Sequence, residues 1–168
     1  MLAICEEKCY NKLDQFPRSN ADINSEGLIK MTVVYSRKAF YYETDRMDII
    51  HHSNYVRWLE EARVYMMDEM GFPFSKLEGM GIVVPVLSVE THYKYPVKFG
   101  DTFEVECRLT EFNGCKFALE YEVRNATQGT LSLTAKTSHC FTTPDLRPVR
   151  LKKVCPELNE LYLKYLEK

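Results

Sequence analysis

Residues 40–71 read FYYETDRMDIIHHSNYVRWLEEARVYMMDEMG, a stretch that joins the end of a strand, a polar turn and a long helix. Ser53 can cap the first free backbone N–H groups of that helix. Gly71 ends it, and Pro73 prevents it from resuming. We therefore predict a helix over residues 53–70, apolar on most sides and so covered by other structure. The apolar residues that recur at helical steps of three or four are Tyr55, Leu59, Ala62, Met66 and Met70.

Strand patterns lie on both sides of this helix. Residues 32–42 precede it, and residues 82–97 follow it with Pro85 near their start, which suits a sheet edge. Three further segments, 102–110, 115–124 and 131–142, alternate apolar and polar residues and are joined by short turns. This pattern predicts an antiparallel meander with one buried face and one face in water. The residues expected to point inward are Phe103, Val105, Cys107, Leu109, Phe117, Leu119, Tyr121, Val123, Leu131, Leu133, Ala135 and Phe141.

The long segment 82–97 is expected to gather its apolar residues on one face: Val83, Leu87, Val89, Thr91, Tyr93 and Tyr95. The buried face of the sheet needs a cover, and the helix over 53–70 is the longest apolar element available. We therefore predict an α+β domain in which a strand, a helix and four more strands follow in order, with the sheet curled around the helix. Pro156 opens a last short helix.

Bulk properties bound the class of protein. The chain has 168 residues and a net charge of −2, which suits one domain and gives no general attraction to nucleic acid. No apolar run approaches the roughly 20 residues needed to span a bilayer. Acidic residues interrupt the N-terminus where a secretory signal needs an apolar core. We expect a weakly patterned extension over residues 1–30, one domain over residues 31–168, and a cytoplasmic location.

The six cysteines are scattered, and their spacing predicts neither zinc nor a disulfide framework. Cys5 and Cys9 lie one turn apart in a possible short helix over residues 4–13. They could form a metal or redox pair, or their spacing could be incidental. We expect reduced thiols, no metal site and no cofactor.

The order of elements and one long motif resemble the hotdog-fold acyl-CoA thioesterases. The similarity is to the 4-hydroxybenzoyl-CoA thioesterase-like family, which includes the Tol–Pal-associated thioesterases. It runs from about residue 32 to residue 153, and its second stretch reads TTPDLRPVRLKK. The matching positions of the main motif are Tyr41, Thr44-Asp45, Asp48, Ile49-Ile50, His51-His52, Asn54-Tyr55, Trp58 and Glu60-Glu61-Ala62-Arg63.

This resemblance implies a hotdog fold, a five-stranded antiparallel sheet wrapped around one long central helix. It also implies hydrolysis of an acyl-CoA thioester to free acid and CoA. The partners expected are the acyl-CoA substrate and a second copy of the chain, as a homodimer or a dimer of dimers. An exposed apolar edge strand over residues 83–95 would pair across a two-fold axis.

Asp45 matches the catalytic aspartate of the family and precedes the helix. Its carboxylate could attack the carbonyl directly or activate a water, and both roles remain open. The structural alternative is an aspartate that only caps a backbone N–H. The oxyanion is expected at the free backbone N–H groups of the helix N-terminus, with the His52 amide as donor.

The side chains around this turn have several possible roles. His52 could orient water or the acyl group, or fill a dimer seam, and His51 is expected to be a bystander. Tyr41 could line the acyl pocket or pack in the core, and Ser53 is assigned to the substrate site at the helix start. Glu60 and Glu61 are rival carboxylates from the helix, although a solvated face is the simpler interpretation.

Coenzyme A carries phosphates, which Arg and Lys bind. Arg147, Arg150, Lys152 and Lys153 cluster after the last strand, where the family match implies a substrate-facing edge. Two residues depart from the family pattern, because Asp48 and Leu146 stand where relatives usually have glycine. The Asp48 departure bears on rate and substrate preference rather than on the reaction.

Other functions fit less well. A non-catalytic protein that binds acyl-CoA or acyl-carrier protein would keep the fold without needing Asp45. A hydratase would need an Asp–His pair at a spacing that Asp48 and His52 do not have. A DNA-binding regulator would need a helix-turn-helix arm, for which residues 1–30 are too short and too acidic. The sequence does not choose between short, long and aromatic acyl groups.

Overall fold

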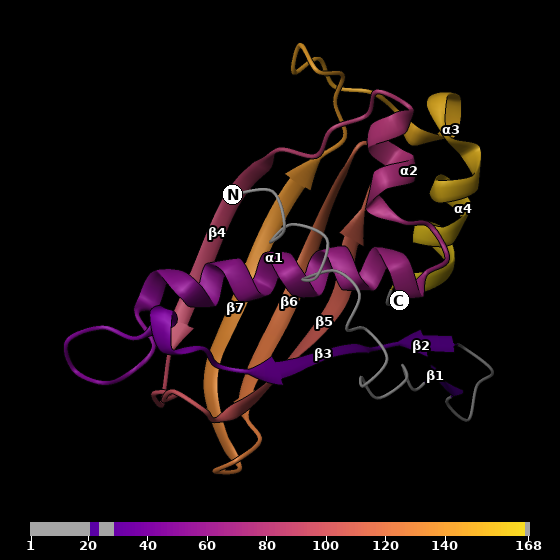
Figure 1. Ribbon diagram of the computed structural model, residues 1–168. Coiled ribbons are helices and arrows are strands. Elements are labelled where there is room, and N and C mark those ends of the chain that lie inside the picture. Colours follow the sequence, from indigo (N-terminus) through magenta and orange to yellow (C-terminus); the bar gives the residue numbers. More distant parts are fainter. Residues whose placement is uncertain (1–20, 24–28, 167–168) are drawn as a thin grey trace, which may run out of the picture.

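The computed structural model describes residues 21–23 and 29–166 (Figure 1). Its strands are β1 (Ala21–Ile23), β2 (Ile29–Met31), β3 (Val33–Lys38), β4 (Val86–Tyr93), β5 (Thr102–Phe112), β6 (Lys116–Asn125) and β7 (Thr130–Cys140). Its helices are α1 (His52–Glu69), α2 (Phe74–Gly79), α3 (Leu151–Val154), α4 (Pro156–Tyr165) and the 3₁₀ helix η2 (Tyr41–Glu43). The predicted helix over residues 4–13 and the Cys5–Cys9 pair lie outside the described residues.

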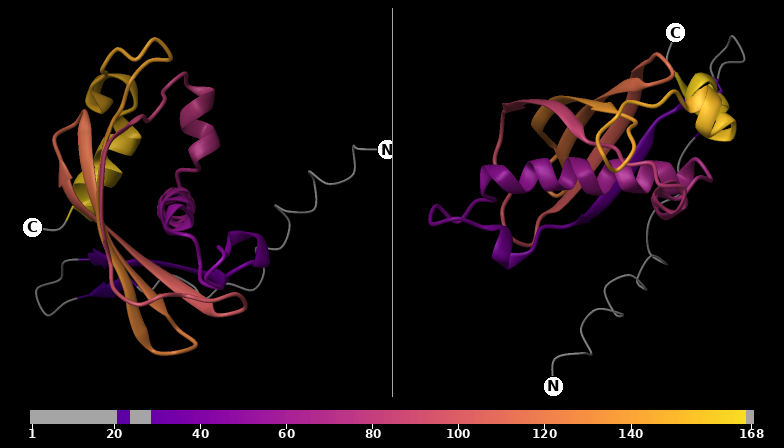
Figure 2. Two further views of the ribbon diagram at one scale, coloured as in Figure 1. Left: turned by 90° about the vertical axis from the view of Figure 1, so that its left-hand side faces the viewer. Right: turned by 90° about the horizontal axis from the view of Figure 1, so that it is seen from above.

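The expected five-stranded antiparallel sheet is confirmed, in the order β3-β5-β6-β7-β4. β1 and β2 form a separate two-stranded sheet. The strand period of two holds on β5 and β6, where the inward rows, from Phe103 on β5 to Val123 on β6, are buried as predicted. Figure 2 shows α1 end-on inside the curve of this sheet, and Trp58 of α1 stacks on Phe103 at 3.7 Å between ring centroids.

The central helix α1 covers only part of the buried face of the sheet. α4 also packs on the core, because its buried Tyr162 contacts the rings of Phe117 and Phe141 and donates to the sulfur of Met67. The sequence predicted this last short helix from Pro156 onward but not where it packs. In the described part of the chain, no helix is both long enough and apolar enough to cross a membrane.

The prediction for β7 is wrong at its beginning. Leu131 is half-buried and Ser132 is buried, whereas the alternation placed Leu131 inside and Ser132 in water. The pairing register between β6 and β7 shifts between Val123 and Arg124, and such an irregularity breaks the strict period of two.

The prediction for β4 is right about its position and its apolar face and wrong about its length. β4 is an edge strand that is shorter than residues 82–97. Val89 and Tyr93 lie on the side that faces α1, and the residues on both sides of the strand are largely exposed. β3 also ends early, at Lys38, because the chain turns into η2 at Tyr41.

The start of α1 differs by one residue from the prediction. The N-cap is His51, whose Nδ1 accepts a hydrogen bond from the Ser53 amide at 3.3 Å, so Ser53 lies inside the first turn. The predicted end is confirmed, because Gly71 has a φ of +76°. An imidazole nitrogen here replaces the hydroxyl that usually caps a helix.

Two residues other than glycine have a left-handed backbone among the described residues, Asp48 with φ 59° and Leu146 with φ 60°. These are the positions where the family resemblance expects glycine. Glycine adopts this conformation without a steric penalty, whereas a residue with a Cβ is strained in it. The two departures from the family pattern therefore fall on turns whose backbone favours glycine.

Replacing Leu146 with glycine should stabilise the protein by up to about 1 kcal/mol, because strain is removed and the exposed side chain gives up little burial. Denaturant unfolding measures the change. Leu146→Ala keeps the Cβ and serves as the control, with no gain expected. A loss of stability in the glycine variant would show that the Leu146 side chain contributes contacts that outweigh the strain.

Candidate active site at the start of helix α1

A tight turn presents Asp45 just before α1. The turn is closed by the amide of Asp45, which donates to the Ile49 carbonyl at 2.9 Å, and by a bridge between Thr44 and Ile50. The Asp45 Oδ1 accepts a hydrogen bond from the Met47 amide at 2.7 Å. One carboxylate oxygen is thus held by the backbone, and this fixes the direction in which the half-buried carboxylate points.

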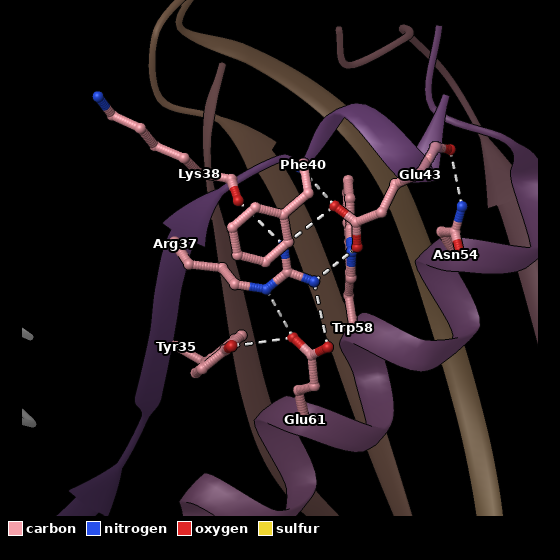
Figure 3. A network of polar contacts seen from close by, with 8 residues as sticks. All are labelled: Tyr35, Arg37, Lys38, Phe40, Glu43, Asn54, Trp58 and Glu61. Carbon is pink, nitrogen blue, oxygen red and sulfur yellow. Dashed lines mark hydrogen bonds and ion pairs between the residues drawn. The ribbon is translucent and has the colours of Figure 1, made fainter. Parts of the chain in front are cut away.

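Arg37 of β3 and Glu43 of η2 form the anchor of this turn (Figure 3). Arg37 donates to both Glu43 oxygens, at 2.7 and 3.0 Å, and to both Glu61 oxygens, at 2.9 and 3.1 Å. It also donates to the Lys38 carbonyl at 3.0 Å. A guanidinium has five N–H donors, so all of them are used.

Glu43 also connects this anchor to α1. Its side chain is 3% exposed and accepts from the indole N–H of Trp58 at 2.8 Å, while its carbonyl accepts from the Asn54 amide group at 2.7 Å. The same carbonyl accepts the backbone N–H of His51 at 2.9 Å. One residue therefore ties β3, the turn and the first two turns of α1 together.

The charge of Glu43 is maintained in spite of its burial. Burial acts to raise the pKa of Glu43, but hydrogen bonds from Arg37, Trp58 and the Phe40 amide outweigh it and hold that pKa below its ordinary range. The carboxylate is therefore ionised at neutral pH.

A cavity of about 200 Å³ opens between this turn and the end of β4. Asp45 and His52 both line it, together with Ile50, Tyr55 and Tyr93. The N-terminus of α1 brings a partial positive charge to it. The His52 amide has no acceptor among the described residues, so it is available to a ligand oxygen. The cavity thus combines a carboxylate with a free backbone donor.

The His52 side chain is exposed and lies against two rings. Its ring centroid is 4.0 Å from that of His51 and 6.5 Å from that of Tyr93. The Tyr93 hydroxyl donates to the His52 carbonyl at 3.0 Å, which fastens the end of β4 to the start of α1. His51, expected to be a bystander, is the helix cap.

Tyr41 and Ser53 do not line this cavity. Tyr41 is 76% exposed and meets Phe99 edge-on at 5.7 Å, so its placement in the core is wrong. Ser53 is exposed, and its hydroxyl lies 2.8 Å from the His51 Nδ1. The assignment of both residues to substrate binding stays a prediction.

The basic residues Arg147, Arg150 and Lys152 are exposed but lie far from Asp45 in the same chain. They follow β7 at the end where Thr142 bridges Val83, just before β4 begins. The Asp45 cavity lies at the other end of β4, roughly 24 Å away by strand rise. Figure 1 shows the segment after β7 at the top and the turn before α1 at the lower left.

The rival carboxylates are also separate from Asp45. The solvated-face interpretation is wrong for Glu61, which binds Arg37 and accepts from the Tyr35 hydroxyl at 2.9 Å. Glu60 is exposed and lines a different cavity, on the middle of α1. Neither carboxylate reaches the Asp45 cavity within one chain.

Sequence reasoning missed the residues that hold the site. Glu43 directly precedes the Thr-Asp pair. It is an acidic residue that follows two tyrosines and precedes a turn, and this local pattern does not predict that it is buried. Tyr93 and Tyr55 were assigned to apolar faces, and their positions in the cavity depend on how β4 meets α1. Glu43 is recognisable as a buried structural residue only from its ion pair with Arg37. That pair joins two separate elements, so the local sequence does not predict it.

The fold is the hotdog fold, and the relatives of the chain place it among the thioester hydrolases. The chain belongs to the thioesterase-like superfamily, whose family model matches residues 41–158.

Individual relatives agree with this family. The chain is 34% identical over 125 residues to the Bacillus subtilis protein YneP, provisionally named an acyl-CoA thioesterase, covering 74% of this chain and 90% of that one. It is 22% identical over 116 residues to the Escherichia coli acyl-CoA thioester hydrolase YbgC, covering 69% and 87%. A DHNA-CoA thioesterase structure from Staphylococcus aureus superposes with a TM-score of 0.77 at 29% identity, covering 79% of this chain and 89% of that one.

Replacing Glu43 with glutamine should destabilise the protein by about 3 kcal/mol, because it leaves a buried guanidinium with one ionised partner fewer. Denaturant unfolding measures the loss. Glu61→Gln, which removes the more exposed partner of the same arginine, should cost about 1 kcal/mol or less. Equal losses in the two variants would contradict the role of Glu43 as the anchor.

Proposed function

We propose that the chain hydrolyses acyl-CoA thioesters in the cavity lined by Asp45 and His52. The observation that carries this proposal is that the Asp45 carboxylate and the first turn of α1 face one cavity. Acyl transfer needs an attacking oxygen and donors for the oxyanion, and these two elements supply them. The acyl-CoA names of the relatives support the class of substrate.

The thioester carbonyl is proposed to lie against the N-terminus of α1. The His52 amide would donate to its oxygen, and the helix dipole would stabilise the negative charge that develops there. The His52 ring stands beside the same carbonyl, where it could orient water or the acyl group.

Asp45 then has two possible roles. As a nucleophile, its free oxygen adds to the carbonyl and expels the CoA thiolate, and water hydrolyses the resulting anhydride. As a general base, it takes a proton from the water that adds to the carbonyl. The Met47 amide, bound to Oδ1, keeps the other oxygen directed away from the backbone in both cases.

The non-catalytic acyl-CoA binder remains the alternative, because the same Met47 contact is what a purely structural aspartate would make. It is disfavoured by the position of Asp45 on a cavity with a free backbone donor. Activity of an Asp45 variant separates the two.

A second copy of the chain is proposed to complete the substrate site. Pairing two β4 edges about a two-fold axis would run them antiparallel, so the start of one β4 would lie beside the end of the other. The partner's basic segment after β7 would then approach the Asp45 cavity of this chain. Within one chain this basic segment is too far from the Asp45 cavity, because the two lie at opposite ends of β4.

Two further expectations are carried over as proposals. The domain boundary at residue 31 would place β1 and β2 outside the minimal domain or at its margin. A cytoplasmic location is consistent with the substrate class, since acyl-CoA is made and used inside cells.

Asp45→Asn should lower the rate of thiol release from acyl-CoA by at least roughly a hundredfold, because it keeps the shape but removes the oxygen that attacks or accepts a proton. The fold should persist, since asparagine can make the same turn contact. Glu60→Gln is the control and should cost much less. Near-normal turnover in Asp45→Asn with a loss in Glu60→Gln would move the chemistry to the helix.

The proposed dimer predicts complementation between two defective chains. Sedimentation at micromolar concentration should give a dimer or a dimer of dimers of the 19.7 kDa chain. A chain with Asp45→Asn, co-expressed with a chain that carries glutamine at positions 147, 150 and 152, should form a mixed dimer with one intact site. Its activity should reach about half that of the wild type, while each parent dimer is weak. A monomer, or a mixed dimer no better than its parents, would contradict this arrangement.

A further inference from the structure

A second cavity lies on the middle of α1, facing β4, β6 and β7, and shares no lining residue with the Asp45 cavity. Its volume is about 60 Å³. One water needs about 10–15 Å³ of such space, so the cavity admits a group of a few heavy atoms. Its polar lining is formed by Glu60 and Arg63 of α1, Tyr121 of β6, and Thr137 and His139 of β7.

Arg63 brings a poorly paired charge to this cavity. It is 5% exposed, and its only ion pair in the described part of the chain is with Glu60, at 3.4 Å. The Glu60 side chain is 68% exposed, and the guanidinium also lies over the Phe74 ring, at 5.2 Å from its centroid. Arg37, by contrast, uses all five donors. A buried guanidinium with so weak a partner calls for a better one, because burying a charge is costly unless it is well paired.

Three side chains form a chain of hydrogen bonds that ends at this cavity. The Tyr121 hydroxyl lies 3.2 Å from the Thr137 hydroxyl, which lies 2.7 Å from the His139 Nε2. The other ring nitrogen of His139, Nδ1, is buried and has no partner among the described residues. His139 is 2% exposed, and Phe117 stacks on its ring at 4.8 Å, which fixes the orientation of the imidazole.

His139 is neutral, so only one of its two ring nitrogens is a hydrogen-bond donor. Burial, with a smaller contribution from Arg63, lowers the pKa of His139 to about 4, so the ring is neutral at neutral pH. A neutral imidazole has one donor and one acceptor nitrogen. If Tyr121 donates to Thr137 and Thr137 donates to Nε2, then Nδ1 carries the hydrogen. In that tautomer the missing partner of Nδ1 is an acceptor.

We propose that this cavity binds the terminal carboxylate of the acyl group, so that the preferred substrates are CoA thioesters of dicarboxylic acids. The ligand carboxylate would take the place of Glu60 on the Arg63 guanidinium and accept from the His139 Nδ1–H. The proposal rests on the proposed thioesterase function and names the acyl class on which it acts.

Residues on one stripe of α1 line both cavities. His52 and Tyr55 line the first, and Val56, Leu59 and Arg63 line the second, at helical steps of three or four. His52 and Arg63 are eleven residues apart, roughly 16 Å along the helix axis, and the arginine side chain leans back toward the N-terminus. An acyl chain of medium length would span this stripe, so we choose eight carbons.

The test compares suberoyl-CoA with octanoyl-CoA, which have the same chain length but end in a carboxylate and a methyl group. The wild type should hydrolyse suberoyl-CoA with a kcat/KM at least about tenfold higher. Arg63→Met should lower kcat/KM about ten- to hundredfold for suberoyl-CoA only, mainly through KM, as expected for the loss of charged hydrogen bonds. Arg57→Met, on the exposed side of the same helix, is the matched control and should change neither substrate.

His139→Phe provides a second variant in case Arg63→Met does not fold. It keeps the stacking on Phe117 and removes Nδ1, and it should lower kcat/KM for suberoyl-CoA several-fold with little effect on octanoyl-CoA. Equal kcat/KM for the two substrates in the wild type, or equal losses in the variants, would overturn the carboxylate subsite and leave the thioesterase function intact. A preference for hydroxylated aromatic thioesters over suberoyl-CoA would overturn it as well.

The two proposals fail in different ways. If no thioester is hydrolysed, the proposed function is wrong, and the carboxylate subsite is then tested by measuring binding affinity. Calorimetric titration of suberoyl-CoA and octanoyl-CoA into the Asp45→Asn protein should show tighter binding of suberoyl-CoA, lost when Arg63→Met is added. Equal affinities would overturn the subsite whatever the activity.

Discussion

The ion pair between Arg37 and Glu43 is the contact on which the rest of the site depends. It is largely buried, it uses both carboxylate oxygens, and Trp58 and Asn54 bond to Glu43 from α1. The pair therefore fixes the distance between β3 and the helix. Asp45 follows Glu43 by two residues, so its carboxylate inherits a rigid position rather than that of a mobile loop. Preorganisation of this kind places a reacting group before substrate arrives.

The edge strand β4 contributes to the Asp45 cavity and is also the surface proposed for pairing with a second chain. Its end contributes Tyr93, which binds the first turn of α1 and lines the Asp45 cavity. Its apolar side chains are largely exposed in one chain, which is a liability unless something covers them. A partner strand would cover them and would also bring basic residues to the cavity. Assembly and substrate binding then use the same surface.

The sheet side of α1 is less apolar than its period suggests. Arg63 and His139 are buried where a pure core would have aliphatic residues, and each lacks a full set of partners among the described residues. Polar groups placed in a core lower stability unless they are satisfied, and the proposed carboxylate ligand would satisfy both of these. Both cavities lie along one stripe of α1, as the proposed ligand requires.

The sequence by itself determined the five strands, the helix end at Gly71, the buried rows of β5 and β6, and the position of Asp45 before α1. These follow from alternation, periodicity and turn residues, which act over a few neighbours. Only the tertiary structure decided that Glu43 is buried, that His51 caps α1, that β4 is exposed on both faces, and that Arg147 lies far from Asp45. Those facts depend on which distant segments come into contact. The energy of an ion pair, a register shift or an unfilled cavity arises from the contact between two segments, so neither segment alone predicts it.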